Sequence, residues 1–394
     1  MKSIEERLNL LKAKREAGGR MTVMILGLGS VGTYLLNYLL NENDERMQIV
    51  VVGRNRDKME TDVNIARVSS LIRRKCRTKI SIEDRVDLEN TERICECLKK
   101  YRPDFIVNTS RVYSGLKYGS ISWNHVRAYG IWAPLAMKYI RNIMKACDLV
   151  NTDAVSVNAS YPDVTIPWMK SAGQAYADFG SGNFNHLIPR IKYAVAEFLG
   201  AEDFWNIRVA LATSHFHDVV ISREGHAEGM KQLLKVYYRE KEIFLDQNEI
   251  FARCGIRMPV DTKRNQMNAS SNFDIVTTLI RALDGEGREC FFSPGAFGNP
   301  GGYPVVIDGS GDEVTAGIDE SDFSMEEMEK ANRQSLYLDG IEGIREGVLS
   351  YTDELREKTK KAFGVNLPKR VSYGQIDDAA EFLIHEIIQR VSIS

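Results

Sequence analysis

One stretch decides the fold of this chain: Met24-Ile25-Leu26-Gly27-Leu28-Gly29-Ser30-Val31-Gly32-Thr33-Tyr34-Leu35-Leu36. Its apolar start, its three glycines and its later apolar spacing predict a buried strand, a tight turn and a helix. In a dinucleotide-binding turn, Gly27 makes the bend, Gly29 admits a pyrophosphate and Gly32 lets the helix approach the strand. The helix N-terminus adds free N–H groups. We therefore predict a dinucleotide site over Gly27, Leu28, Gly29, Ser30, Val31 and Gly32; the alternative is a tight turn without a ligand.

The end of the second expected strand, Met47–Val52, bears on the cofactor. NAD-binding sequences usually carry an acid there, which bonds the ribose hydroxyls. Here Gly53 takes that place, and Arg54, Asn55 and Arg56 follow. A carboxylate repels a 2′-phosphate, whereas guanidinium groups bind one. The sequence therefore favours NADP(H) over NAD(H), the alternative being that both arginines are ordinary loop charges.

Composition narrows the class of protein. A chain of 394 residues with net charge −2 suggests two domains and no general nucleic-acid surface. The basic cluster at 67–77 is best explained as a solvated helix face. Six cysteines without a zinc-type spacing indicate reduced thiols, and neither a signal peptide nor a membrane span is apparent. We expect a cytoplasmic protein with no membrane or nucleic-acid partner and no resident metal.

The rest of the first half alternates strands and helices. Residues 1–17 are predicted to form an amphipathic helix that covers either its own domain or a neighbouring subunit. A fourth strand over 104–109 places Thr109, Ser110 and Arg111 beside the cofactor, because ligands bind at the carboxyl ends of such strands. Residues 112–124 contain glycine and serine and are predicted to be a loop-like lid.

Taken in order, these pieces resemble the lactate/malate dehydrogenase superfamily. The likeness rests on the glycine turn, on the strand Ile106–Ser110, on Asn158–Asp163 and on Tyr303–Gly311. Its strongest part is Gly180-Ser181-Gly182-Asn183 with Arg190-Ile191-Lys192-Tyr193-Ala194-Val195-Ala196-Glu197-Phe198-Leu199-Gly200, which is similar to a block of that family.

The resemblance implies an α/β fold with a Rossmann doubly wound parallel sheet, followed by an α+β substrate-binding domain. We expect an N-terminal helical extension (1–20), a cofactor domain (21–179), a substrate domain (180–349) and a C-terminal helical extension (350–394). It also implies a homo-oligomer, a dimer or a tetramer, and hydride transfer with a carbonyl, hydroxyl or imine carbon of a small anionic substrate.

By the same resemblance, a histidine that follows a strand of the second domain exchanges the proton. His215 takes that place, and His217 is an alternative on the same face if the segment is extended. Arg190 aligns with the arginine that clamps the substrate carboxylate. The remaining candidates are Asn158 for the cofactor and Tyr161, Asn183 and Lys117 for the substrate. A structural histidine pair and an ordinary helix arginine remain the alternatives.

Departures from the family pattern indicate a rebuilt site. The acid that should orient the histidine is replaced by Leu187, and Arg111 stands where a small glycine is usual. Two other functions stay open. An NAD- and metal-dependent family 4 glycosidase would use His186, His215 and His217 around a metal ion. A non-catalytic NADP(H)-binding sensor or scaffold would bind cofactor without turnover.

Overall fold

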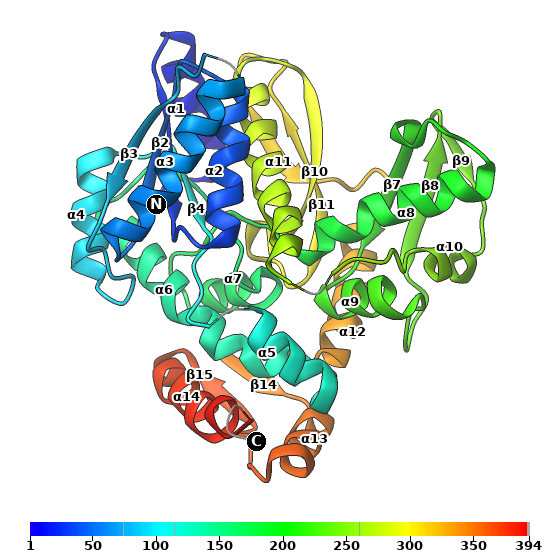
Figure 1. Ribbon diagram of the computed structural model, residues 1–394. Coiled ribbons are helices and arrows are strands. Elements are labelled where there is room, and N and C mark those ends of the chain that lie inside the picture. Colours follow the sequence, from blue (N-terminus) through cyan, green and yellow to red (C-terminus); the bar gives the residue numbers. More distant parts are fainter. Residues whose placement is uncertain (74, 114, 260, 392–394) are drawn as a thin grey trace.

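The central element of the computed structural model, which describes residues 1–73, 75–113, 115–259 and 261–391, is a six-stranded parallel sheet (Figure 1). The strand order is β3-β2-β1-β4-β5-β6. All six residues of β1 are buried, as expected for a strand covered by helices on both faces. The strands are β1 (Met21–Leu26), β2 (Met47–Val52), β3 (Lys79–Glu83), β4 (Phe105–Asn108), β5 (Val155–Asn158) and β6 (Phe179–Gly180).

Helices connect these strands and cover the sheet (Figure 1). The chain adds β2 and β3 on one side of β1 and then β4, β5 and β6 on the other, so a crevice opens beyond the carboxyl ends of β1 and β4. This is the predicted doubly wound fold. The helices are α2 (Ser30–Glu42), α3 (Arg56–Arg73), α4 (Thr91–Tyr101), α5 (Gly115–Ile121), α6 (Ala133–Leu149) and α7 (Pro162–Ser171).

The N-terminal helix α1 (Ile4–Glu16) covers its own domain. Leu8 and Leu11 are buried in the core that β1 and β2 share. Arg7 forms a buried ion pair with Asp178, and its Nη1 donates to the Ala154 carbonyl at 2.7 Å. The sequence left open whether this helix covers its own domain or a neighbouring subunit, and in the structure it covers its own domain.

The second half is built from antiparallel sheets with helices against them, as predicted for the substrate domain. In Figure 1 the sheet β7–β9 lies at the right and β10–β12 lies between it and the Rossmann sheet. The elements are α8 (Asn183–Leu199), β7 (Ile207–Ala212), α9 (His215–Glu224), β8 (Leu233–Tyr238), β9 (Lys241–Ile243), α10 (Gln247–Arg253), α11 (Asn265–Leu283), β10 (Arg288–Pro294), β11 (Gly302–Asp308), β12 (Thr315–Ile318) and α12 (Met325–Leu338).

The C-terminal segment was predicted to consist of helices only, and this is wrong. It includes a three-stranded antiparallel sheet, whose first hairpin turns at Glu346 and Gly347 with φ of 49° and 73°. Two successive positive φ values are typical of the tight turns that suit a hairpin. The elements are β13 (Ile341–Arg345), β14 (Val348–Tyr351), α13 (Asp353–Phe363), β15 (Arg370–Ser372), α14 (Ile376–Leu383) and α15 (Gln389–Val391).

Residues 112–124 were expected to be loop-like, and this is wrong. Helix α5 and a π-helical turn, Ser122–Val126, occupy most of the segment. Tertiary contacts outweigh the weak helix propensity of its glycines and serines. The Tyr118 ring lies 5.6 Å from the Trp132 ring, and the Trp132 indole N–H donates to the Ser122 hydroxyl.

Candidate functional site

A cavity of about 650 Å³ lies where the carboxyl ends of the parallel strands meet the second half of the chain. It extends from the glycine turn, past the segment after β5, to helices α8 and α9. The start of α11 and helix α5 close other sides. Its lining includes Gly29, Ser30, Val31, Thr109, Arg111, Tyr129, Tyr161, Asp163, His186, Arg190, His215, Asp218 and Arg264.

The glycine turn has the geometry that the sequence predicts. Gly27 has φ +93°, and a Cβ on Gly32 would lie 2.3 Å from the Gly27 carbonyl oxygen. A Cβ on Gly29 would meet no protein atom within 4 Å. Gly29 precedes α2 without a side-chain cap, so the first N–H groups of the helix face open space. The turn fits the pyrophosphate of a dinucleotide.

The residues after β4 support this turn. The Thr109 hydroxyl donates to the Gly27 carbonyl at 2.6 Å. Arg111 lines the cavity and donates to the Ala159 carbonyl at 2.6 Å and to the Tyr118 hydroxyl at 3.2 Å. Arg111 therefore ties α5 to the end of β5. The resemblance implied a glycine at this position, and a glycine has no side chain to connect these two segments.

Eight of the thirteen predicted cofactor residues lie outside the cavity lining, among them Leu28, Ser110 and Asn158. Asn158 is fully buried, and its amide N–H donates to the Thr165 hydroxyl at 3.0 Å while its oxygen accepts from Asn108 at 2.9 Å. The Ser110 hydroxyl donates to the Asn108 amide oxygen. Leu28 is 7% exposed and belongs to the core. These residues hold the ends of β4 and β5 in place.

The basic residues after β2 are exposed, and they differ in their partners. Arg56 Nη1 donates to Asp84 Oδ1 at 3.3 Å, and its Nε lies 3.6 Å from Glu60. The Asn55 side chain accepts from the Lys58 N–H at 3.0 Å, at the start of α3. Among the described residues, Arg54 forms no hydrogen bond or ion pair. Arg54 and Arg56 are not among the residues that line the cavity.

His215 begins α9 and lies among polar groups from three distant segments. Its Nδ1 lies 3.4 Å from Asp339 Oδ2, and its backbone N–H donates to Asp163 Oδ1 at 3.0 Å. The rings of Tyr129 and Tyr161 meet its ring edge-on at 4.6 and 5.3 Å. Burial alone would lower the pKa of His215, but Asp339, Asp163 and Asp218 outweigh it and raise the pKa.

Asp339 supplies the carboxylate that the sequence lacked at Leu187. It is fully buried and follows the last turn of α12. The Tyr161 hydroxyl donates to its Oδ2 at 2.6 Å, and the Tyr129 N–H donates to its Oδ1 at 2.7 Å. Sequence reasoning missed Asp339 because it lies 124 positions from His215. The only local signal was a polar Asp-Gly turn, which is typical of a helix end.

His217 faces away from the cavity. The expectation that His215 and His217 share a face required an extended segment, and this is wrong, since both lie in α9 and two helical residues are about 200° apart. His217 is fully buried. Its Nδ1 lies 2.7 Å from the Ser335 hydroxyl, and its Nε2 lies 2.8 Å from the Glu228 carbonyl oxygen. Both ring nitrogens therefore have structural partners.

Arg190 lines the cavity from α8 and is 3% exposed. Its Nη1 donates to the Cys254 carbonyl at 2.8 Å, and its Nη2 contacts Met258 Sδ at 3.3 Å. Asp218 on α9 faces the same cavity, and burial raises its pKa to about 7. Burial also raises the pKa of Asp163, to about 6. The sequence singled out neither Asp163 nor Arg264, although Asp163 lies in the first turn of α7, close after the end of β5.

The predicted substrate residues fall in different places. Tyr161 lines the cavity and has φ 44°, so its backbone adopts the uncommon left-handed conformation. Lys117 is exposed, with its ammonium 5.6 Å from the centre of the Tyr113 ring, and it is not among the cavity residues. Asn183 is the first residue of α8, and its side chain lies outside the described part of the chain.

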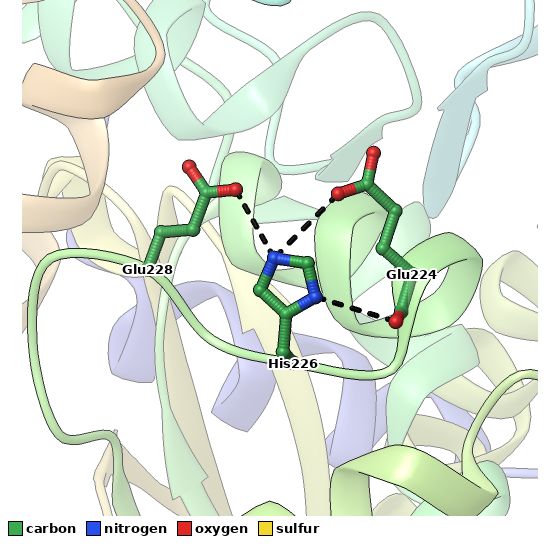
Figure 2. Close-up of side chains that lie close together, drawn as sticks. All are labelled: Glu224, His226 and Glu228. Carbon is green, nitrogen blue, oxygen red and sulfur yellow. Dashed lines mark hydrogen bonds and ion pairs between the residues drawn. The ribbon is translucent and has the colours of Figure 1, made fainter.

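A possible metal group lies away from the three histidines that a glycosidase would use. Within the described ranges, Glu224, His226 and Glu228 bring their ligand atoms within 4.8 Å of one another (Figure 2). The Arg127 guanidinium forms ion pairs with both carboxylates, and His226 Nε2 lies 3.3 Å from Glu228. One guanidinium therefore already occupies both carboxylates of this cluster. His186 is separate from it, and burial lowers the pKa of His186 to about 3.

Comparisons with known proteins agree with this architecture. Residues 23–120 match the saccharopine dehydrogenase NADP binding domain. The solved lactate dehydrogenase from Eimeria maxima, with NADH and oxamate, has a TM-score of 0.50 and 13% identity, over 80% of this chain and 91% of that one. Malate dehydrogenase from Plasmodium falciparum has a TM-score of 0.50 and 13% identity, over 87% and 99%. No curated protein sequence matches.

These comparisons show the fold. The chain has the lactate/malate dehydrogenase fold, and its first domain is of the Rossmann nucleotide-binding kind. At 13% identity the substrate does not follow from the likeness. No helix in the described residues is long and apolar enough to cross a membrane.

Proposed function

We propose that this protein is an NADP(H)-dependent oxidoreductase that transfers hydride to or from a carbonyl, hydroxyl-bearing or imine carbon of a small anionic substrate. The observation that carries the proposal is one continuous cavity with a dinucleotide turn at one end and a histidine–carboxylate pair at the other. Bound at Gly29–Val31, the nicotinamide cofactor would supply or accept the hydride. Arg54 would bind the 2′-phosphate of the cofactor, with Arg56 beside it.

His215 is the proposed acid/base group. Asp339 lies at Nδ1 and orients the ring, which assigns proton exchange to Nε2. The Tyr161 hydroxyl and the Tyr129 N–H fix the Asp339 carboxylate, so its position does not depend on the substrate. Tyr129 and Tyr161 enclose the imidazole and limit the access of water. Its raised pKa favours the protonated ring, which is the form that reduction of a carbonyl requires.

Two cationic side chains can bind the anionic part of the substrate. Arg190 and Arg264 both line the cavity. The Nε of Arg190 is buried and has no hydrogen-bond partner among the described residues, so the guanidinium has a donor to offer. A carboxylate or phosphate is the group that such donors recognise.

A comparison of two histidine variants tests this function. NADPH oxidation is measured at 340 nm with a panel of 2-oxo acids, with and without ammonium or methylamine. We expect His215→Ala to lower kcat/KM by about 100-fold or more while NADPH affinity stays within about two-fold. His217→Gln is the matched control; it should lower Tm, because it disturbs two buried hydrogen bonds, and change kcat/KM by less than about ten-fold.

Two results would contradict the proposal. Full activity of His215→Ala would remove that residue from the chemistry. Tight NADPH binding without turnover of any oxo acid, imine or sugar phosphate would favour a sensor or scaffold instead.

We also propose a cytoplasmic homo-oligomer. Helix α3 exposes an apolar face of Ile65, Val68, Leu71 and Ile72, each at least 57% exposed. Residues at this spacing lie on one side of a helix and are costly to leave in water. Light scattering should report a dimer or tetramer, and Val68→Glu with Ile72→Glu should yield monomers. A monomeric wild-type protein would overturn this assignment.

A further inference from the structure

The Tyr129 side chain lies against the proposed acid/base group, His215. The centres of the two rings are 4.6 Å apart, and their planes meet at 77°. Asp339 holds both residues: its Oδ2 lies 3.4 Å from His215 Nδ1, and its Oδ1 accepts the Tyr129 backbone N–H at 2.7 Å. The two side chains therefore extend side by side from one carboxylate.

The Tyr129 hydroxyl is available to a ligand. Tyr129 lines the cavity, and in the part of the chain that the structure describes its hydroxyl forms no hydrogen bond. The neighbouring Tyr161 differs, because its hydroxyl donates to Asp339 Oδ2 at 2.6 Å. A partly buried hydroxyl without a partner costs free energy, and an oxygen atom of a ligand would supply the missing hydrogen bond.

The charged groups around this hydroxyl belong to the substrate end of the cavity. Asp218, Arg223 and Arg264 line the cavity and act electrostatically on Tyr129, and Asp218 acts on His215 as well. Burial raises the pKa of Tyr129 to about 12. The phenol therefore keeps its proton at neutral pH and is a neutral hydrogen-bond donor beside the imidazole.

The surrounding packing fixes the Tyr129 ring. The Trp123 ring centre lies 6.3 Å away, and the Gly130 N–H donates to the Asp339 carbonyl at 2.9 Å. A Cβ on Gly119 would lie 3.8 Å from Tyr129 Cε1, so α5 packs against the ring. A donor that is already in place needs no reorganisation during the reaction, which is the condition for effective stabilisation of a developing charge.

Resting on the proposed function, we propose that Tyr129 is a second catalytic residue, whose hydroxyl donates a hydrogen bond to the substrate oxygen that becomes negative during hydride transfer. When the hydride of the bound cofactor reaches the carbonyl carbon, the C=O π electron pair moves to the oxygen, and His215 Nε2 gives that oxygen its proton. The products are the alcohol, the oxidised cofactor and neutral His215. Tyr129 keeps its proton throughout and stabilises the oxygen as it gains charge.

Single-turnover kinetics test this role. NADPH-loaded protein is mixed with pyruvate, oxaloacetate, 2-oxoglutarate or hydroxypyruvate, and hydride transfer is followed at 340 nm. We expect Tyr129→Phe to lower the rate with the most active compound by about 100-fold, because removal of one donor to an oxyanion has an effect of this size. The substrate concentration at half-maximal rate and Tm should change little, since the ring and the backbone N–H remain.

Two further readouts separate a catalytic role from a structural one. Deuterium at C4 of NADPH should slow Tyr129→Phe at least as strongly as wild type, which slower product release would not produce. The second readout needs no turnover: Tyr129→3-fluorotyrosine is studied by ¹⁹F NMR in the NADP⁺ complex, where an oxo acid is not reduced. We expect the resonance to move when the most active oxo acid is added, and the resonance of Tyr337→3-fluorotyrosine to stay in place.

Tyr337→Phe is the matched control for the kinetics, because Tyr337 is half exposed on α12 and is not among the cavity residues. It should keep the wild-type rate. The inference is overturned if Tyr129→Phe also keeps this rate, if its isotope effect disappears, or if the ¹⁹F resonance at position 129 does not move.

Other outcomes distinguish this inference from the proposed function. Turnover of imines alone would overturn the inference and leave the function, because no oxygen then gains charge. Full activity of His215→Ala together with a slow Tyr129→Phe would remove the histidine from the function and keep Tyr129 as the donor. A wild-type protein that reduces none of the compounds would remove both.

Discussion

The two ends of the cavity are built in different ways. The cofactor end is a turn of six residues, in which Gly32 lies close to the Gly27 carbonyl and Gly29 directly precedes a single helix. The substrate end is assembled from Tyr161, His215 and Asp339, which lie in three segments far apart in the chain. A short turn has its geometry fixed by neighbours in sequence, whereas a polar cluster of this kind exists only when the whole chain is folded.

The two ends also differ in how strongly the ligand constrains the residues that can form them. The turn must fit one cofactor, so each glycine has a defined task. The polar cluster must fit a substrate, and many arrangements of a histidine and a carboxylate can orient a proton donor. In this chain the carboxylate comes from the end of α12 rather than from α8, where Leu187 is buried in an apolar core.

The largest expected effect compares two glycines of the turn. Gly29→Val should lower NADPH affinity by about 100-fold or more and leave Tm nearly unchanged, because its side chain enters open space that the cofactor would fill. Gly32→Ala should instead destabilise the fold by about 1–3 kcal/mol, since its Cβ would lie 2.3 Å from the Gly27 carbonyl oxygen. Fluorescence titration and thermal unfolding measure the two. Equal NADPH affinity of Gly29→Val and wild type would refute the cofactor site.

The substrate end is expected to depend on Asp339. Asp339→Asn should reduce kcat by about 10- to 100-fold and shift the limb of the pH–rate profile that reports His215 to lower pH, because the carboxylate raises the pKa of His215. Asp312→Asn, an exposed acid, is the control. An unchanged pH profile together with a lower Tm would show that Asp339 acts only in folding.

Substitutions of Arg54 and Arg56 should change the preference for NADP(H) over NAD(H) by a smaller factor. Arg54→Asp should shift the ratio of NADP(H) to NAD(H) affinity by about ten-fold toward NAD(H), because it replaces a cation with a repelling carboxylate. Arg56→Asp should have a smaller effect, since Arg56 already contacts Asp84 and Glu60. The ratio of Kd values from titration is the measurement. If the wild-type protein bound NAD(H) more tightly than NADP(H), this would contradict the proposal that Arg54 binds the 2′-phosphate.

The last comparison concerns the pH dependence of stability. The pKa of Asp218 is raised in the folded protein to about 7, above the unfolded value near 3.8, so the folded state favours the protonated form. Its contribution is complete below about pH 4 and is lost as pH rises through about 7. Each unit of pKa difference corresponds to about 1.4 kcal/mol at most. Urea unfolding at pH 5 and pH 8 should show a smaller loss of stability for Asp218→Asn than for wild type. An identical loss would contradict a raised pKa.

Sequence reasoning predicted much of the fold but a smaller part of the site. Apolar runs such as Val23–Leu26 and Met47–Val52 were found because a strand buried on both faces has a continuous apolar pattern. The segment 112–124 was misjudged because its helix depends on packing against Trp132. The C-terminal sheet was missed for a similar reason: its strands are three to five residues long and carry a weak pattern.

The sequence by itself determined the dinucleotide turn, the parallel sheet and the position of His215 after a strand, because these follow from short-range steric and apolar patterns. Only the tertiary structure decided that His215 faces the cavity and His217 does not, since the local helix sets that direction. Only the tertiary structure brought Asp339 and Tyr129 to His215. Contacts between residues so far apart in the chain are set by the packing of whole elements, and a local pattern does not encode them.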